Sequence, residues 1–101
     1  MDETKHKPVF NRRIFWDVNF DALDYDKRGR FVIERVFERG DVGDIRQCRR
    51  YYGDEKITEV LLTAKYLPEA RLHLAAAVIN KPVNDFLYYK LRQLNPALYP
   101  Y

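Results

Sequence analysis

One stretch of the sequence, FWDVNFDALDYD from residue 15 onward, most resembles a metal site. Three oxygen donors occupy the first, third and fifth positions of a helix-loop-helix calcium loop: Asp17, Asn19 and Asp21. Such a loop also needs glycine at its sixth position and a bidentate glutamate at its twelfth. Ala22 and Arg28 stand there instead. A cation would lose its strongest ligand and meet a like charge, so we expect no metal to bind here.

Residues that could act as nucleophiles or bases are scarce. The sequence contains no serine, which excludes serine hydrolase chemistry. His6 and His73 have no cysteine or histidine partner at a metal-ligand spacing. Cys48 lies on an apolar helical stripe, which favours an inert buried thiol over a nucleophile. We therefore expect a protein that is not an enzyme and that needs no cofactor.

The clearest chemical cluster consists of arginines. Arg46, Arg49 and Arg50 are three and four residues apart, a spacing that places them on one face of a helix. Guanidinium groups suit phosphates or the carboxylates of a protein partner. The alternative is a solvated face whose arginines pair with Asp44 or Asp54. The spacing fits both interpretations.

Two aromatic residues near the first predicted helix bear on partner binding. Phe31 lies off the apolar stripe of that helix, among charged residues. If Phe31 is exposed it is a candidate partner contact, and if Phe15 or Trp16 covers it, it belongs to the core. We expect Trp16 itself to be core or half-buried, because a small chain can hardly leave ~200 Å² of aromatic surface in water.

The stretch LAAAVINKPVNDFLYY, residues 74–89, resembles a helix-turn-helix. Ala76 falls where the two helices would cross, Asn80 at the turn and Phe86 where the second helix would close onto the first. Lys81 departs from the pattern, because the position after the turn is normally apolar. If this were a DNA-reading unit, the contacts would come from the second helix and its flanks: Asn84, Tyr88, Lys90 and Arg92.

The elements that position these residues are helical. Apolar residues recur at helical spacing, and no segment alternates like a strand for more than a few residues. The pattern predicts an all-α fold, a single small domain of about five short helices: 26–39, 42–52, 54–66, 68–79 and 82–94. Asp24 or Asp26 is expected to cap the first helix and Asp41 the second. Gly40 is expected to end the first helix in the left-handed conformation, and Gly53 is expected to end the second.

Composition and charge limit the domain organisation, the class of partner and the cellular location. We expect a flexible basic arm over residues 1–12, a helical domain over 13–95 and a short tail over 96–101. The net charge of +3 is mild for a dedicated nucleic-acid binder. A single cysteine excludes an internal disulfide, and no apolar run approaches the ~20 residues that cross a bilayer. The sequence also lacks a signal-peptide pattern at its start, so a cytoplasmic location is expected.

The sequence as a whole resembles a family of short, uncharacterised bacterial domains that are common in Bacteroidetes. The likeness covers roughly residues 14–90 and is carried by Phe15-Trp16-Asp17, the runs 32–36 and 38–41, Tyr51-Tyr52-Gly53, and Pro82 with Phe86. The resemblance implies no known enzyme activity. Members are often encoded beside a nucleotidyltransferase-like toxin of the abortive-infection type, which implies an antitoxin or accessory role.

These observations predict a non-enzymatic module that binds a protein partner, with a cognate toxin as the partner that the resemblance implies. The alternative is a helix-turn-helix transcriptional regulator, whose amino-terminal arm would contact the DNA backbone. A third possibility is a structural domain that pairs with a second copy of itself.

Overall fold

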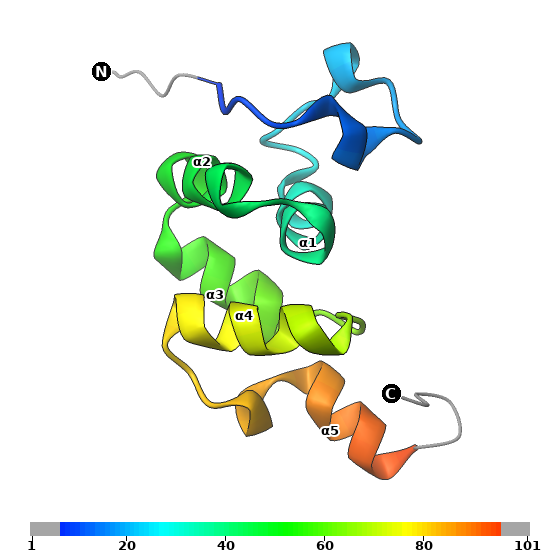
Figure 1. The fold of residues 1–101 in the computed structure, drawn as a ribbon, viewed down its shortest axis with the longest axis vertical. Coiled ribbons are helices and arrows are strands. Elements are labelled where there is room, and N and C mark those ends of the chain that lie inside the picture. Colours follow the sequence, from blue (N-terminus) through cyan, green and yellow to red (C-terminus); the bar gives the residue numbers. More distant parts are fainter. Residues whose placement is uncertain (1–6, 96–101) are drawn as a thin grey trace.

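The computed structural model describes residues 7–95, and these residues form an all-helical domain (Figure 1). The α-helices are α1 (Gly29–Arg39), α2 (Val42–Tyr52), α3 (Asp54–Thr63), α4 (Glu69–Ile79) and α5 (Leu87–Leu94). Three short 3-10 helices accompany them: η1 (Arg12–Phe15), η2 (Phe20–Ala22) and η3 (Val83–Asp85). The predicted all-α class and the five α-helices are confirmed.

The core centres on α1 and α3. Their inward faces are almost completely buried and consist of Val32, Ile33, Val36, Phe37, Ile57, Val60 and Leu61. Helix α2 packs on both α1 and α3, whereas α4 and α5 cover the other side of α3 (Figure 1). Because Leu74 and Val78 give α4 a second apolar side, the sequence predicts that this helix is central, and the burial of its side chains does not support that prediction. Of its apolar residues Leu72 and Ala75 are buried, while Leu74 and Val78 are only half-buried.

Helix α2 begins where the sequence predicts. The Asp41 carboxylate accepts a hydrogen bond from the Asp44 amide at 3.0 Å, and the Asp44 carboxylate accepts one from the Asp41 amide at 3.0 Å. This reciprocal capping box satisfies two amides that the first turn leaves without helical partners. Gly53 has φ +86° and ends α2, as expected.

The first helix begins three residues later than predicted. The Asp24 carboxylate accepts from the amides of Asp26 and Lys27 at 3.0 and 2.9 Å, which lowers its pKa. These bonds stabilise the turn before α1, and the N-cap residue Arg28 makes no side-chain capping bond. The aspartates therefore shape the approach to the helix without capping it.

Gly40 ends α1 for a reason other than the predicted one. Its backbone is extended (φ −79°, ψ 161°) and any residue could adopt it. The requirement is space, because a Cβ at this position would lie 2.7 Å from the Val36 carbonyl oxygen and 2.9 Å from Asp44 Cβ.

We expect Gly40→Ala to destabilise the fold. The added methyl must displace backbone or the capping-box residue, which typically costs about 1–3 kcal/mol. Chemical denaturation followed by circular dichroism would measure the loss. Gly43→Ala is the matched control, since its Cβ would meet only the Asp41 carboxylate at 3.3 Å. Equal stability of the two variants would contradict the steric argument.

The segment before α1 crosses α1 and α2 and seals one end of the core (Figure 1). Phe10, Ile14, Phe15 and Tyr25 are buried. Packing therefore begins within residues 7–12, which the sequence assigned to the arm; residues 1–6 and the tail 96–101 lie outside the described residues. Trp16 is 70% exposed, so the expectation of a core or half-buried indole was wrong.

Within residues 7–95, no helix combines the length and the apolar character needed to cross a lipid bilayer.

Candidate functional site

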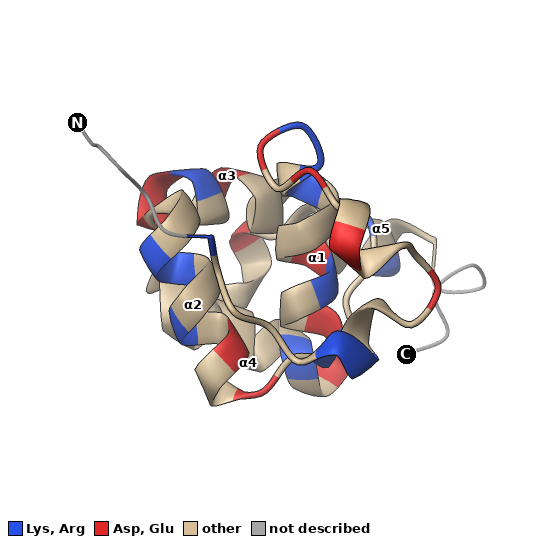
Figure 2. Ribbon diagram, turned by 90° about the horizontal axis from the view of Figure 1, so that it is seen from above, with Lys and Arg blue, Asp and Glu red and all other residues tan. Residues whose placement is uncertain are grey.

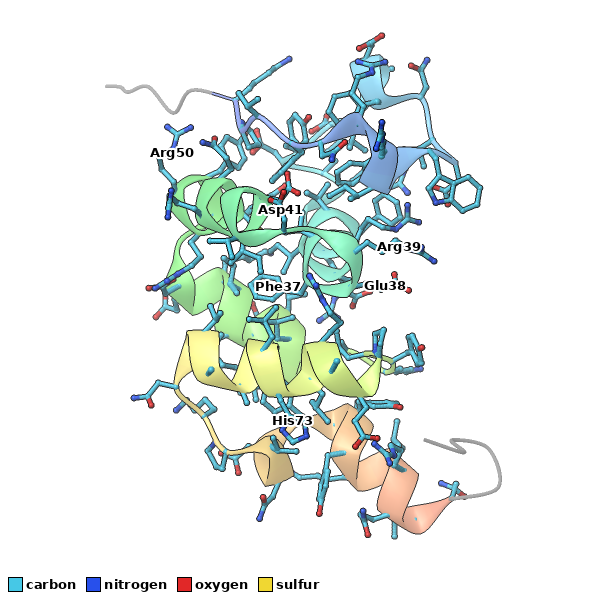
Figure 3. The ribbon with its side chains drawn as sticks, in the orientation of Figure 1. Phe37, Glu38, Arg39, Asp41, Arg50 and His73 are labelled. Atoms are coloured by element: carbon cyan, nitrogen blue, oxygen red, sulfur yellow. The ribbon has the colours of Figure 1, made fainter. Side chains whose placement is uncertain are left out.

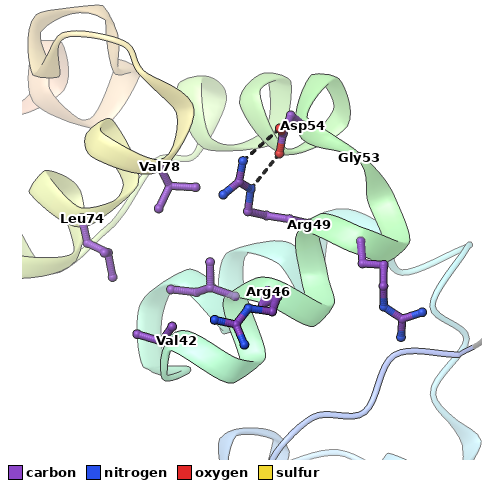
Figure 4. A pocket seen from close by; sticks show the side chains of 9 residues that line it. Val42, Arg46, Arg49, Gly53, Asp54, Leu74 and Val78 are labelled. Carbon is purple, nitrogen blue, oxygen red and sulfur yellow. Dashed lines mark hydrogen bonds and ion pairs between the residues drawn. The ribbon is translucent and has the colours of Figure 1, made fainter.

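The predicted arginine cluster belongs to α2, whose basic positions are blue in Figure 2, and it lies beside a groove between α2 and α4 (Figure 4). The groove has a volume of about 580 Å³. Its apolar floor consists of Val42, Ile45, Leu74 and Val78. Its rim carries Arg46, Arg49 and Arg50 together with Gly53 and Asp54. The structure thus brings together all three arginines that the sequence proposed for partner binding.

The fold explains why this groove stays open. Helices α2 and α4 each pack on α3, and they face one another across the groove. The side chains on α2 follow a helical spacing of three and four residues, and Leu74 and Val78 do the same on α4. Val42 is 69% exposed and adds an accessible aliphatic side chain to the α2 side of the groove. The apolar second side of α4, which the sequence showed, is therefore one wall of the groove.

The three arginines differ in their internal bonds. Arg49 donates two hydrogen bonds to Asp54, at 2.9 and 3.0 Å, and lowers the pKa of that carboxyl. Arg50 donates to the Gln47 side chain at 2.7 Å. Arg46 is exposed and, within residues 7–95, makes no side-chain hydrogen bond or ion pair. Pairing with Asp54 thus accounts for one arginine, while Asp44 serves the capping box.

Phe31 lies in a different patch from the arginine cluster. Its half-buried ring packs between the guanidinium groups of Arg28 and Arg35, whose carbons lie 4.8 and 4.9 Å from the ring centre. The Phe15 ring lies 6.2 Å away on a third side. Phe31 is therefore partly core and partly surface, and it does not line the arginine-rimmed groove.

The two aspartates of the stretch that resembles a calcium loop, Asp17 and Asp21, form ion pairs with arginines. Asp17 accepts two hydrogen bonds from Arg35, at 2.7 and 2.9 Å, and this lowers the Asp17 pKa. Asp21 accepts one from Arg12 at 2.9 Å, with the same effect on its pKa. In the part of the chain that the structure describes, no three His, Cys, Asp or Glu side chains gather as metal ligands would. These aspartates instead hold the amino-terminal segment in place.

The remaining reactive groups lie apart from the groove. Cys48 is fully buried, and burial raises the pKa of its thiol to about 12. His73 lies on the side of α4 opposite α2 (Figure 3). The groove lining contains no cysteine, histidine or hydroxyl side chain, so its chemistry is that of apolar contact and positive charge.

We expect the Cys48 thiol to resist modification in the folded protein. With a pKa of about 12 it is protonated at neutral pH, and no route for the reagent leads to it while the core is closed. Ellman's reagent should label it at least about a hundredfold more slowly in buffer than in strong denaturant. Comparable rates in both conditions would contradict the buried placement.

The helix-turn-helix resemblance holds at the turn but not beyond it. Asn80 adopts the left-handed conformation (φ 56°, ψ 49°), as predicted. After Pro82 the chain forms η3, and α5 begins only at Leu87, so the expectation of a fifth helix from residue 82 was wrong. The alternative DNA contact Asn84 lies in η3 and not on a recognition helix.

The other proposed DNA contacts do not form one exposed face. Tyr88 is only 1% exposed, so its ring belongs to the core. Arg92 lies 3.3 Å from the Glu69 carboxylate and over the Tyr88 ring. Lys90 is exposed on α5. Three of the four proposed contacts lie on α5. Of these, only Lys90 is exposed, because Tyr88 is buried and Arg92 is paired with Glu69.

Comparison with known proteins gives a family without an assigned activity. The model of a family of unknown function (DUF6922) matches residues 10–61, which span the amino-terminal segment, α1, α2 and most of α3. No curated protein and no solved structure matches the chain. The matched region includes the α2 wall of the groove and ends before the α4 wall.

Proposed function

The chain belongs to the family DUF6922, and from its groove we propose that it is a non-enzymatic module that binds a protein partner. The observation that supports this most is the combination of an open apolar floor with an arginine rim. Arginine is enriched at protein–protein interfaces, and an apolar floor with a charged rim has the same arrangement as their apolar core and polar rim. The absence of any reactive side chain from the lining favours binding over catalysis.

The sequence resemblance suggests which partner to try first. Domains of the type that this sequence resembles are often encoded beside a nucleotidyltransferase-like toxin. We therefore propose that the chain is an antitoxin-like or accessory partner that binds such a toxin directly. Arginine would contribute through charged hydrogen bonds to carboxylates on the toxin surface.

The test is capture of the protein encoded by the neighbouring gene. The tagged chain should retain that protein at micromolar concentration. Arg46→Glu should weaken the interaction by at least about tenfold, because it places a carboxylate against the carboxylates of the partner. Lys90→Glu is the matched control, since Lys90 is an exposed cation outside the groove lining. No capture at micromolar concentration would overturn the proposal of a toxin partner.

DNA binding is the alternative, and the left-handed turn at Asn80 is the observation that favours it. It would use the flanks of α5, with Asn84, Lys90 and Arg92 as contacts. A salt-titrated mobility shift with the DNA upstream of the gene would test it, since phosphate contacts make affinity fall steeply with salt. Affinity that Lys90→Glu abolishes and Arg46→Glu spares would favour this alternative over the protein-binding function.

A further inference from the structure

We propose, resting on the protein-binding function above, that the groove binds an acidic amphipathic α-helix of the partner. The helix would place an apolar stripe on the floor of the groove and carboxylates against its arginine rim. The argument has three parts: the shape of the floor, the charge of the rim and the secondary structure that the walls can accept.

The apolar floor of the groove fits the apolar stripe of a helix. Helix α2 contributes Val42 and Ile45 to this floor and α4 contributes Leu74 and Val78, so apolar groups line both sides of the groove (Figure 4). Residues 42 to 49 of α2 span about 10.5 Å, which is two helical turns. A partner helix would fill this length with apolar residues at positions i, i+3 or i+4, and i+7.

The positive charge of the rim favours a negatively charged partner. Three of the nine lining residues are arginine, against a single carboxylate, Asp54. Arg49 is already bonded to Asp54, so Arg46 and Arg50 supply the charge for a partner. In a twofold-symmetric pair that joins groove to groove, the same arginines would lie face to face, and like charges at an interface are strongly unfavourable. An acidic partner therefore fits better than self-association.

The walls favour a helical occupant over other peptide conformations. Addition of a strand requires an open sheet edge, and residues 7–95 contain no strand. Recognition of a polyproline segment uses aromatic side chains, and none lines this groove. Two helical walls with aliphatic side chains are the arrangement into which amphipathic helices bind.

Synthetic peptides test this proposal without knowledge of the natural partner. The probe is a fluorescein-labelled 18-residue peptide with leucine at helical spacing and glutamate elsewhere. One matched peptide carries lysine in place of every glutamate, and another has the glutamate peptide's composition in scrambled order. Fluorescence anisotropy should show the ordered glutamate peptide binding at least about tenfold more tightly than either. Equal binding of all three would overturn the proposal.

Variants of the chain locate the binding. Arg46→Glu and Leu74→Asp should each weaken binding of the glutamate peptide by about tenfold or more. Asp54→Asn should strengthen it severalfold, because this change releases Arg49 to the ligand while the exposed ion pair that it removes is worth little to stability. Lys65→Glu, outside the groove lining, should change nothing. Unchanged binding in Arg46→Glu and Leu74→Asp would place the peptide elsewhere and overturn the proposal.

Two further outcomes have distinct meanings. A dimer in sedimentation experiments that Leu74→Asp abolishes would assign the groove to a second copy and overturn the acidic-helix proposal. Capture of the neighbouring gene's product by a chain that does not bind the glutamate peptide would also overturn it. In that last case the protein-binding function itself would stand.

Discussion

Replacement of Asp44 by alanine should destabilise the fold by about 2–4 kcal/mol. Asp44 is only 5% exposed, and its carboxylate accepts from the Asp41 amide at 3.0 Å and the Asn11 amide at 2.9 Å. Alanine would remove the capping box and leave two amides without their acceptor. The same change would weaken the attachment of the amino-terminal segment to α2, because it removes the Asn11 bond and leaves that of the Val9 amide to Gln47.

Urea denaturation, followed both by circular dichroism and by the fluorescence of Trp16, would measure this effect. Glu59→Ala is a suitable control, because Glu59 is an exposed carboxylate of α3 and such surface changes usually stay within about 0.5 kcal/mol. Asp44→Asn should fall between the two, since an amide keeps one acceptor oxygen. A denaturation midpoint of Asp44→Ala equal to that of the unmodified chain would refute the assignment.

Replacement of Arg71 by methionine should cost about 2–3 kcal/mol. The Arg71 guanidinium donates to the carbonyl oxygens of Phe37 at 2.7 Å and Val36 at 3.4 Å, and also to that of Gly40. Carbonyls in the last turn of a helix mostly lack partners within it, although that of Val36 also accepts from the Gly40 amide at 2.7 Å, and the negative end of the helix dipole favours a cation there. One side chain of α4 therefore closes the end of α1.

Arg71→Lys distinguishes this role from simple charge. An ammonium group is compact and cannot present the planar fork that reaches several carbonyls at once, so lysine should recover less than half of the loss. Arg39→Met is the matched control, because Arg39 projects from the surface of the same helix end (Figure 3). Full recovery by lysine, or an equal loss in the control, would show that the fork geometry is not what stabilises the helix end.

Much of the helical framework could be predicted because its signals are local. The capping box of Asp41 depends on residues three apart, and the stop at Gly53 depends on its own backbone angle. The apolar stripe of α1 appears at the predicted spacing: Val32, Ile33, Val36 and Phe37 are all buried. Such features need no knowledge of distant contacts.

The errors arise where tertiary contacts decide the outcome. Trp16 follows the buried Phe15 in a 3-10 turn too short for periodicity to indicate which aromatic faces inward. The requirement at Gly40 comes from the approach of Asp44 on the next helix. The delayed start of α5 follows from η3, which a proline at the start of a helical pattern does not foretell.

The arginine site was predicted in part for the same reason. Helical spacing on α2 correctly grouped Arg46, Arg49 and Arg50, since all three belong to one element. The opposite wall, with Leu74 and Val78, depends on how α4 packs against α3, and no local pattern reports that. The apolar second side of α4 was the available signal, and it was attributed to burial.

The two walls of the groove also fall on opposite sides of residue 61, where the family match ends. The α2 wall, which carries the arginines together with Val42 and Ile45, is encoded within the matched segment, and the α4 wall is encoded after it. Exchange of the carboxyl-terminal half alone would thus alter which hydrophobic surface a ligand meets while preserving the charge that attracts it. In such an exchange the three arginines of this chain would stay in place while Leu74 and Val78 were replaced.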